Sequence, residues 1–142
     1  MRLVAAAVAL ACASVLGACG GPSADLYLVE RTGSTPGARL SMLVGDGGTV
    51  TCNGGPERQI SSAQLIDARE IAGELNGDEE EPGPATRDVR LPPGPGSILR
   101  YRVRSEKGAV SFSDTSRAQP PVFYKVAQLT RRLSKEVCGL PR

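Results

Sequence analysis

Histidine is absent from the 142-residue sequence, and so is tryptophan. Without histidine the chain cannot form a Ser-His or Cys-His nucleophile pair, a histidine general base, or a zinc site of the usual histidine-containing kinds. Aromatic residues make up only 4% of the chain, so the core has to be built from Leu, Val, Ile and Ala. We therefore expect no catalytic residue, no metal, no cofactor and no enzyme activity, with an enzyme that uses carboxylates alone as the alternative.

Excess charge of one sign is also missing. The formal net charge is +2 and charged residues of both signs are interspersed, whereas a nucleic-acid-binding domain concentrates basic residues on one surface. A chain of this length and composition forms one domain with a short extra segment. We expect no nucleic-acid partner.

The longest uncharged run, residues 3–18, follows Met1-Arg2 directly. It is shorter than the roughly 20 residues that a transmembrane helix needs and is typical of a signal peptide. The run ends in Leu16-Gly17-Ala18-Cys19, which resembles the bacterial lipobox. That resemblance implies that residues 1–18 are removed and that the thiol of Cys19 carries lipid.

The expected product is a lipoprotein on the extracytoplasmic face of the cell membrane, with residues 19–25 as a tether and 26–142 as a single domain. An uncleaved N-terminal helix, or an ordinary signal peptide cut nearby, is the alternative. Two further cysteines, Cys52 and Cys138, remain after processing. In an oxidising compartment they most simply form one disulfide, with two free thiols as the alternative.

Apolar and polar residues alternate in five short segments, which is typical of half-buried strands. These segments are 26–31, 39–44, 49–52, 98–104 and the return through Val110 and Phe112. Helical spacing predicts one helix from Ser61 or Ser62 to about Asn76 and another that starts at Pro120 or Pro121. We expect Asp114 and Ser116 to cap the turn into the second helix.

The order βββαββα predicts an α+β fold, an antiparallel sheet of about five strands with two helices packed on one face. Residues 78–97 carry no periodicity and several prolines, and are expected to form a long, exposed, flexible acidic and Pro/Gly-rich loop. The acidic run 78–81 lacks the ligand spacing of a calcium loop and is interpreted as solvated charge.

Alternation in 98–104 places Arg100, Arg102 and Arg104 together on the face of the sheet away from the helices. Three guanidinium groups there could bind an anionic partner. The alternative is a solvated face on which each arginine covers neighbouring apolar surface.

Two segments resemble known inhibitor families. The segment 49–55, a strand ending in Cys52 and a Gly-rich turn before a helix, resembles the subtilisin-inhibitor-like family, although residues 61–76 lack the cysteine that this family places in the helix. The hairpin from Tyr101 to Phe112, followed by proline and a helix, is similar to the emfourin-type metalloprotease inhibitors. Both resemblances imply a small inhibitor or binding module, and neither identifies an inhibitory residue.

The sequence therefore predicts a non-enzymatic, membrane-anchored binding module with a protein partner in the cell envelope. The more specific prediction is that this module inhibits an extracellular peptidase, and residues 78–97 are the first place to look for an inhibitory segment. The alternative is a structural or assembly lipoprotein of the envelope that contacts another envelope protein through the sheet.

Overall fold

The computed structural model describes residues 24–141, which form six strands and two helices. Their order is β1 (Asp25–Gly33), β2 (Leu40–Gly45), β3 (Thr49–Cys52), β4 (Glu57–Gln59), α1 (Ser62–Asn76), β5 (Leu99–Ser105), β6 (Gly108–Ser113) and α2 (Pro121–Glu136). The signal peptide and Cys19 expected from the sequence lie outside the described residues. Within residues 24–141, no helix is both long enough and apolar enough to span a membrane.

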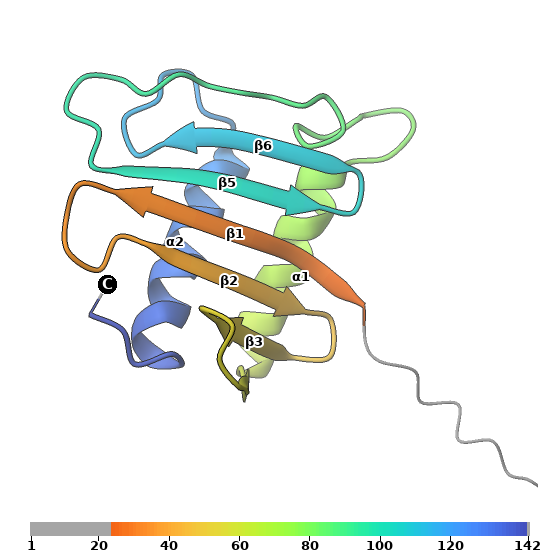
Figure 1. The fold of residues 1–142 in the computed structure, drawn as a ribbon. Coiled ribbons are helices and arrows are strands. Elements are labelled where there is room, and N and C mark those ends of the chain that lie inside the picture. The colour runs from red at the N-terminus through yellow and green to blue at the C-terminus, as the bar shows by residue number, and fades with distance from the viewer. Residues whose placement is uncertain (1–23, 142) are drawn as a thin grey trace, which may run out of the picture.

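The strands form one sheet in the order β4-β3-β2-β1-β5-β6, and every neighbouring pair is antiparallel. Both helices lie against the same face of this sheet (Figure 1). The α+β architecture predicted from the sequence is thus confirmed, with six strands in place of about five. The pairing of β1 with β5 joins segments that are far apart in the chain.

The additional strand, β4, was not predicted because its three residues carry no apolar signal. Glu57, Arg58 and Gln59 are all exposed, and they pair with Thr51, Val50 and Thr49 of β3. A three-residue polar edge strand shows no alternation that a sequence pattern could reveal.

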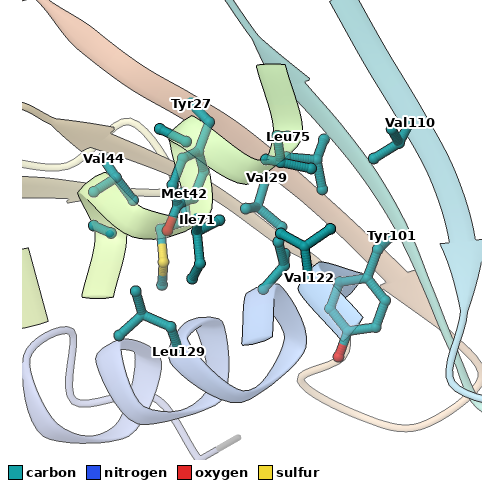
Figure 2. Packing of buried hydrophobic residues seen from close by; sticks show 14 of the residues in the cluster. Tyr27, Val29, Met42, Val44, Ile71, Leu75, Tyr101, Val110, Val122 and Leu129 are labelled. Carbon is teal, nitrogen blue, oxygen red and sulfur yellow. The ribbon is translucent and has the colours of Figure 1, made fainter. Parts of the chain in front are cut away.

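Alternate residues of the strands point toward the helices and form the core with the buried faces of α1 and α2 (Figure 2). The ring of Phe112 stacks on that of Tyr101 at a centroid distance of 5.0 Å and on that of Phe123 at 4.4 Å. Such ring pairs contribute about 0.5–1.5 kcal/mol each beyond the area they bury. The few aromatic residues of this chain are therefore concentrated where β5, β6 and α2 meet.

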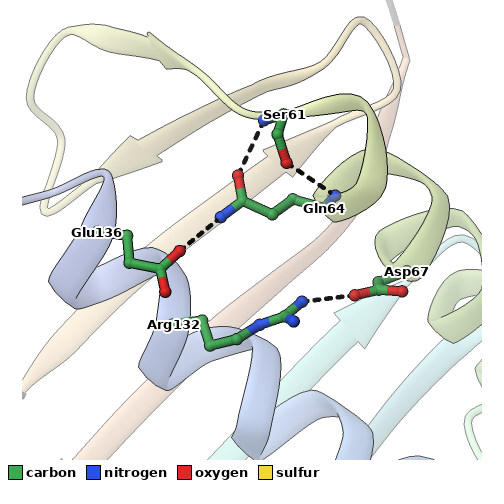
Figure 3. A network of polar contacts seen from close by, with 5 residues as sticks. All are labelled: Ser61, Gln64, Asp67, Arg132 and Glu136. Atoms are coloured by element: carbon green, nitrogen blue, oxygen red, sulfur yellow. Dashed lines mark hydrogen bonds and ion pairs between the residues drawn. The ribbon is translucent and has the colours of Figure 1, made fainter.

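Helix α1 begins and ends as its sequence predicts. The hydroxyl of Ser61 accepts the amide N–H of Gln64, while the side-chain oxygen of Gln64 accepts the amide N–H of Ser61. The Gln64 amide also donates to Glu136 near the end of α2, at 3.1 Å, and Arg132 pairs with Asp67 (Figure 3). The start of α1 is thereby fixed beside the end of α2.

Asp114 and Ser116 were expected to cap the turn into the second helix; neither caps α2 itself, although the hydroxyl of Ser116 accepts the amide N–H of Ser113 within the turn. The residue before the helix is Pro120, which makes no side-chain capping hydrogen bond. The carboxylate of Asp114 instead accepts the amide N–H of Ile98 at 3.1 Å, and the hydroxyl of Ser116 donates to the carbonyl of Pro92 at 2.9 Å. Both side chains bond the segment before β5, and the chain then passes Ala118, whose φ is +55°, before the helix starts.

The segment 78–97 contains no described helix or strand, but isolated bridges and backbone hydrogen bonds place it. The amide of Ala85 donates to the carbonyl of Leu75 at 2.9 Å. Ser111 of β6 accepts the amide of Leu91 at 2.8 Å and donates to the carbonyl of Val89 at 3.1 Å. The segment therefore passes from the end of α1 along the outer edge of β6 (Figure 1), which covers part of that sheet edge.

A glycine permits this path at the end of α1. A Cβ on Gly83 would lie 2.3 Å from the carbonyl oxygen of Leu75 and 2.6 Å from that of Glu74, distances at which a side chain overlaps the backbone. Only glycine lets the segment lie this close to the last turn of the helix.

Cys52 and Cys138 form the expected disulfide, with a Cα–Cα distance of 6.3 Å and a sequence separation of 86. Cys52 is the last residue of β3, and Cys138 follows the end of α2. The bond therefore fixes the C-terminal helix to the β3 side of the sheet.

Candidate binding surface on the open face of the sheet

The sheet has one face without helices, and we call the part of it formed by β1, β5 and β6 the open face. Its side chains include Glu30, Thr32, Arg100, Arg102, Arg104 and Ser111. All three arginines are exposed, whereas Tyr101 and Val103 between them are buried. The structure thus brings together the three arginines of the sequence prediction. Their role in binding stays a prediction.

The strand register arranges these side chains in rows across the open face. Arg102 lies opposite Glu30 of β1 and Ser111 of β6, while Arg100 lies opposite Thr32. Residues opposite each other in antiparallel strands have Cβ atoms about 4.5–5.5 Å apart. An acidic residue, Glu30, is therefore built into the same surface, a feature that the arginine pattern alone did not reveal.

Glu30 forms an ion pair with Arg104 at 3.9 Å. Within residues 24–141, Arg100 and Arg102 form no ion pair. Two exposed guanidinium groups on this face thus keep their hydrogen-bond donors available to a partner from solution.

A groove of about 450 Å³ runs over the open face beside these two arginines. We call it the open-face groove; its lining residues are Glu30, Thr32, Leu91, Pro93, Arg100, Tyr101, Arg102, Ser111, Phe112 and Ser113. One wall is the segment that follows β6 along its outer edge, which contributes Leu91 and Pro93. The groove thus combines cationic groups with apolar surface.

Hydroxyl groups hold that wall in place. The hydroxyl of Thr115 donates to the carbonyl of Gly94 at 3.0 Å, and Ser116 bonds the carbonyl of Pro92. The amide of Ser113 donates to the hydroxyl of Ser116 at 2.9 Å. The Ser/Thr-rich turn after β6 therefore positions residues 92–94 beside the groove.

A surface of this kind suits recognition of an anionic group next to apolar surface. Guanidinium groups bind carboxylate and phosphate through two parallel hydrogen bonds. Exposed ion pairs contribute only about 0.2–1 kcal/mol each, so affinity would depend on Arg100 and Arg102 acting together and on contact with Leu91 and Pro93.

Sequence reasoning missed the wall of the groove because residues 78–97 have no periodicity. It also missed the burial of Arg31, although alternation from Tyr27 and Val29 places Arg31 on the helix-facing side of β1. That signal was available in the sequence, since every second residue of a strand shares a face.

The acidic run 78–81 is exposed, and the carboxylate of Asp78 accepts the amides of Glu80 and Glu81 at 2.9 and 2.7 Å. These bonds close a local turn. In the part of the chain that the structure describes, no group of three or more His, Cys, Asp or Glu residues is placed to hold a metal ion.

In comparisons with known proteins, no family model, no curated protein and no solved structure matches this chain. The site therefore has to be interpreted from its own geometry and chemistry.

Proposed function

We propose that the chain is a non-enzymatic binding module that recognises an anionic partner in the cell envelope through the open-face groove. The observation that carries the proposal is the exposure of Arg100 and Arg102, without an ion-pair partner among residues 24–141, beside the groove. Cationic groups next to apolar surface favour a protein surface or segment with carboxylates over a bare polyanion.

The proposal includes membrane attachment through lipid on Cys19. Its support is the uncharged run 3–18 ahead of Leu16-Gly17-Ala18-Cys19, and the short distance along the chain from Cys19 to the start of β1 at Asp25. Intact mass of the protein extracted from membranes tests it. We expect a mass that begins at Cys19 with added acyl chains; an unlipidated mass would remove the anchor from the proposal.

Partner recognition is tested by immobilising the protein and passing detergent-solubilised envelope extract over it. The Arg100→Gln/Arg102→Gln double variant should lose the captured acidic protein, and raised salt should release it because exposed ion pairs are screened. The Arg132→Gln variant, changed on the helix side of the molecule, should retain the partner. Equal capture by the double variant would contradict the proposal.

Peptidase inhibition is the second candidate, and the exposed segment beside β6 favours it. Ser111 bonds the residues on either side of Arg90, namely Val89 and Leu91. Arg90 itself is exposed on the outer edge of the molecule, where it pairs with Asp88 at 2.9 Å. Peptidases bind substrates as extended strands. A panel of secreted peptidases, assayed with the protein and its Arg90→Ala variant, tests this: inhibition should be seen and should weaken on substitution.

A further inference from the structure

A pocket of about 390 Å³ lies on the helix side of the sheet, between β1, the start of β5 and the last turns of α2. Its lining residues are Arg31, Leu99, Arg131, Lys135 and Pro141. Three of these are cations and none is an acid. The pocket is separate from the open-face groove, because Arg31 and its neighbour Glu30 lie on opposite faces of β1.

Arg31 is a buried and firmly positioned member of this group. Its side chain is only 2% exposed, its Nε donates to the carbonyl of Ala38 at 2.8 Å, and its terminal nitrogen donates to the carbonyl of Gly37 at 3.2 Å. These bonds come from the turn between β1 and β2. A buried guanidinium held in one orientation contributes positive potential at a fixed place, with little screening by water.

Arg131 and Lys135 lie four residues apart on α2, so both project from the same side of the helix. Like charges at this spacing repel each other and destabilise a helix slightly. Neither forms an ion pair with another residue of 24–141. Both are exposed, which keeps them accessible to a ligand.

A neighbouring pocket shares Leu99 and Arg131 with this one, and its lining includes one acidic residue, Asp114. Its carboxylate accepts hydrogen bonds from the amide of Ile98 and the hydroxyl of Ser97, and it forms no ion pair with Arg131. The described part of the chain thus offers no carboxylate that neutralises Arg131 and Lys135.

We propose that this pocket binds a small ligand through a carboxylate or phosphate group held by Arg131 and Lys135, with Arg31 at its base. Both oxyanions accept several charge-assisted hydrogen bonds at once, which is what clustered guanidinium and ammonium groups provide. Leu99 and Pro141 form apolar walls that suit a small organic body attached to the anion. The volume lies within the range of about 300–1,000 Å³ that is usual for small-molecule sites.

The proposal is tested by titrating the purified, isotope-labelled full chain in detergent with inorganic phosphate and, separately, with succinate. Amide chemical shifts are followed by NMR, with sodium chloride at the same ionic strength as reference. We expect saturable shifts centred on Gly37, Ala38, Leu99 and Arg131 with at least one probe, and the stronger probe identifies the preferred oxyanion. Shifts that match those in sodium chloride with both probes would overturn the proposal.

Matched variants locate the binding. Arg131→Gln and Lys135→Gln, both at exposed positions, should each weaken binding about tenfold by removing a charge-assisted hydrogen bond. Arg132→Gln, the next residue on the helix, removes the same charge at a side chain that pairs with Asp67, and should leave the affinity unchanged. If all three variants bind equally well, the anion is not held by this pocket.

Discussion

The disulfide between Cys52 and Cys138 joins the end of β3 to the segment after α2 across a sequence separation of 86. It therefore closes a loop that contains β4, α1, β5, β6 and α2. A cross-link of this span removes much of the conformational freedom of the unfolded chain.

Replacing both cysteines with alanine should lower the free energy of unfolding by about 2–5 kcal/mol, because the unfolded chain regains loop entropy. Urea unfolding of the protein and the Cys52→Ala/Cys138→Ala variant measures this. A reductant should destabilise the unmodified protein and leave the variant unaffected. Equal stability of the two proteins without reductant would show that the bond contributes little.

The capping box of α1 gives a second prediction. Ser61→Ala removes the hydroxyl that accepts the amide of Gln64, and should lower the free energy of unfolding by about 1 kcal/mol. Ser62→Ala is the matched control, since Ser62 is exposed in the first turn and its loss should change stability by less than about 0.5 kcal/mol. Similar losses in both variants would mean that the cap is not the cause.

The ion pairs between α1 and α2 give a third prediction. Lys125 bonds Glu70 and Glu74, and the hydrogen bond and charge of Lys125 lower the pKa of Glu70 below its ordinary 4.5. A pKa that is lower in the folded than in the unfolded protein stabilises the fold above pH 4.5, and this stabilisation is lost as the pH falls through the folded-state pKa of Glu70. Lys125→Gln should raise the pKa of Glu70 toward 4.5 in a carbon-detected NMR titration.

Lys107→Gln serves as the control for that titration, since Lys107 bonds the carbonyl of Gly77 and not Glu70. A pKa of Glu70 that stays low in the Lys125→Gln variant would contradict the assignment of the shift to Lys125.

Alkaline pH should weaken the fold through its buried phenols. Burial, with a smaller contribution from the charge of Asp67, raises the pKa of Tyr27 above its ordinary 10.0, and burial also raises that of Tyr101. A raised pKa adds stability below pH 10.0 that is lost as the pH rises through the folded value, with a slope of about 1.4 kcal/mol per pH unit for each such group.

Urea unfolding between neutral and alkaline pH tests this effect. Tyr27→Phe should reduce the alkaline loss of stability, and the Tyr27→Phe/Tyr101→Phe double variant should reduce it further. Tyr124→Phe, at a position that is 59% exposed, should behave as the unmodified protein. An unchanged slope in the double variant would refute the explanation by buried phenols.

Local signals in the sequence predicted most of the fold. Alternation predicted a strand at 39–44, where β2 lies, and helical spacing predicted a helix from Ser61 or Ser62 to about Asn76, which matches α1. These features depend on neighbouring residues, which is why a single sequence reveals them.

Features that depend on tertiary contact were not predictable. Leu91 joins the groove only because its amide bonds Ser111 of β6, and Asp114 was misassigned because its partner Ile98 is distant in sequence. The sequence placed Arg100, Arg102 and Arg104 on one face. That Arg104 alone of the three pairs with Glu30 follows from the register between β1 and β5, which the sequence does not reveal.

The central claim, that the open face contacts a partner in the envelope, is tested most directly by photocrosslinking in intact cells. A photoreactive residue such as p-benzoylphenylalanine is introduced at Thr32, an exposed position that lines the open-face groove, and at Arg132 on the helix side as the control. We expect a discrete adduct with an envelope component from position 32, which disappears when Arg100→Gln/Arg102→Gln is added, and no such adduct from position 132. Absence of an adduct at position 32, or the same adduct from both positions, would contradict the claim.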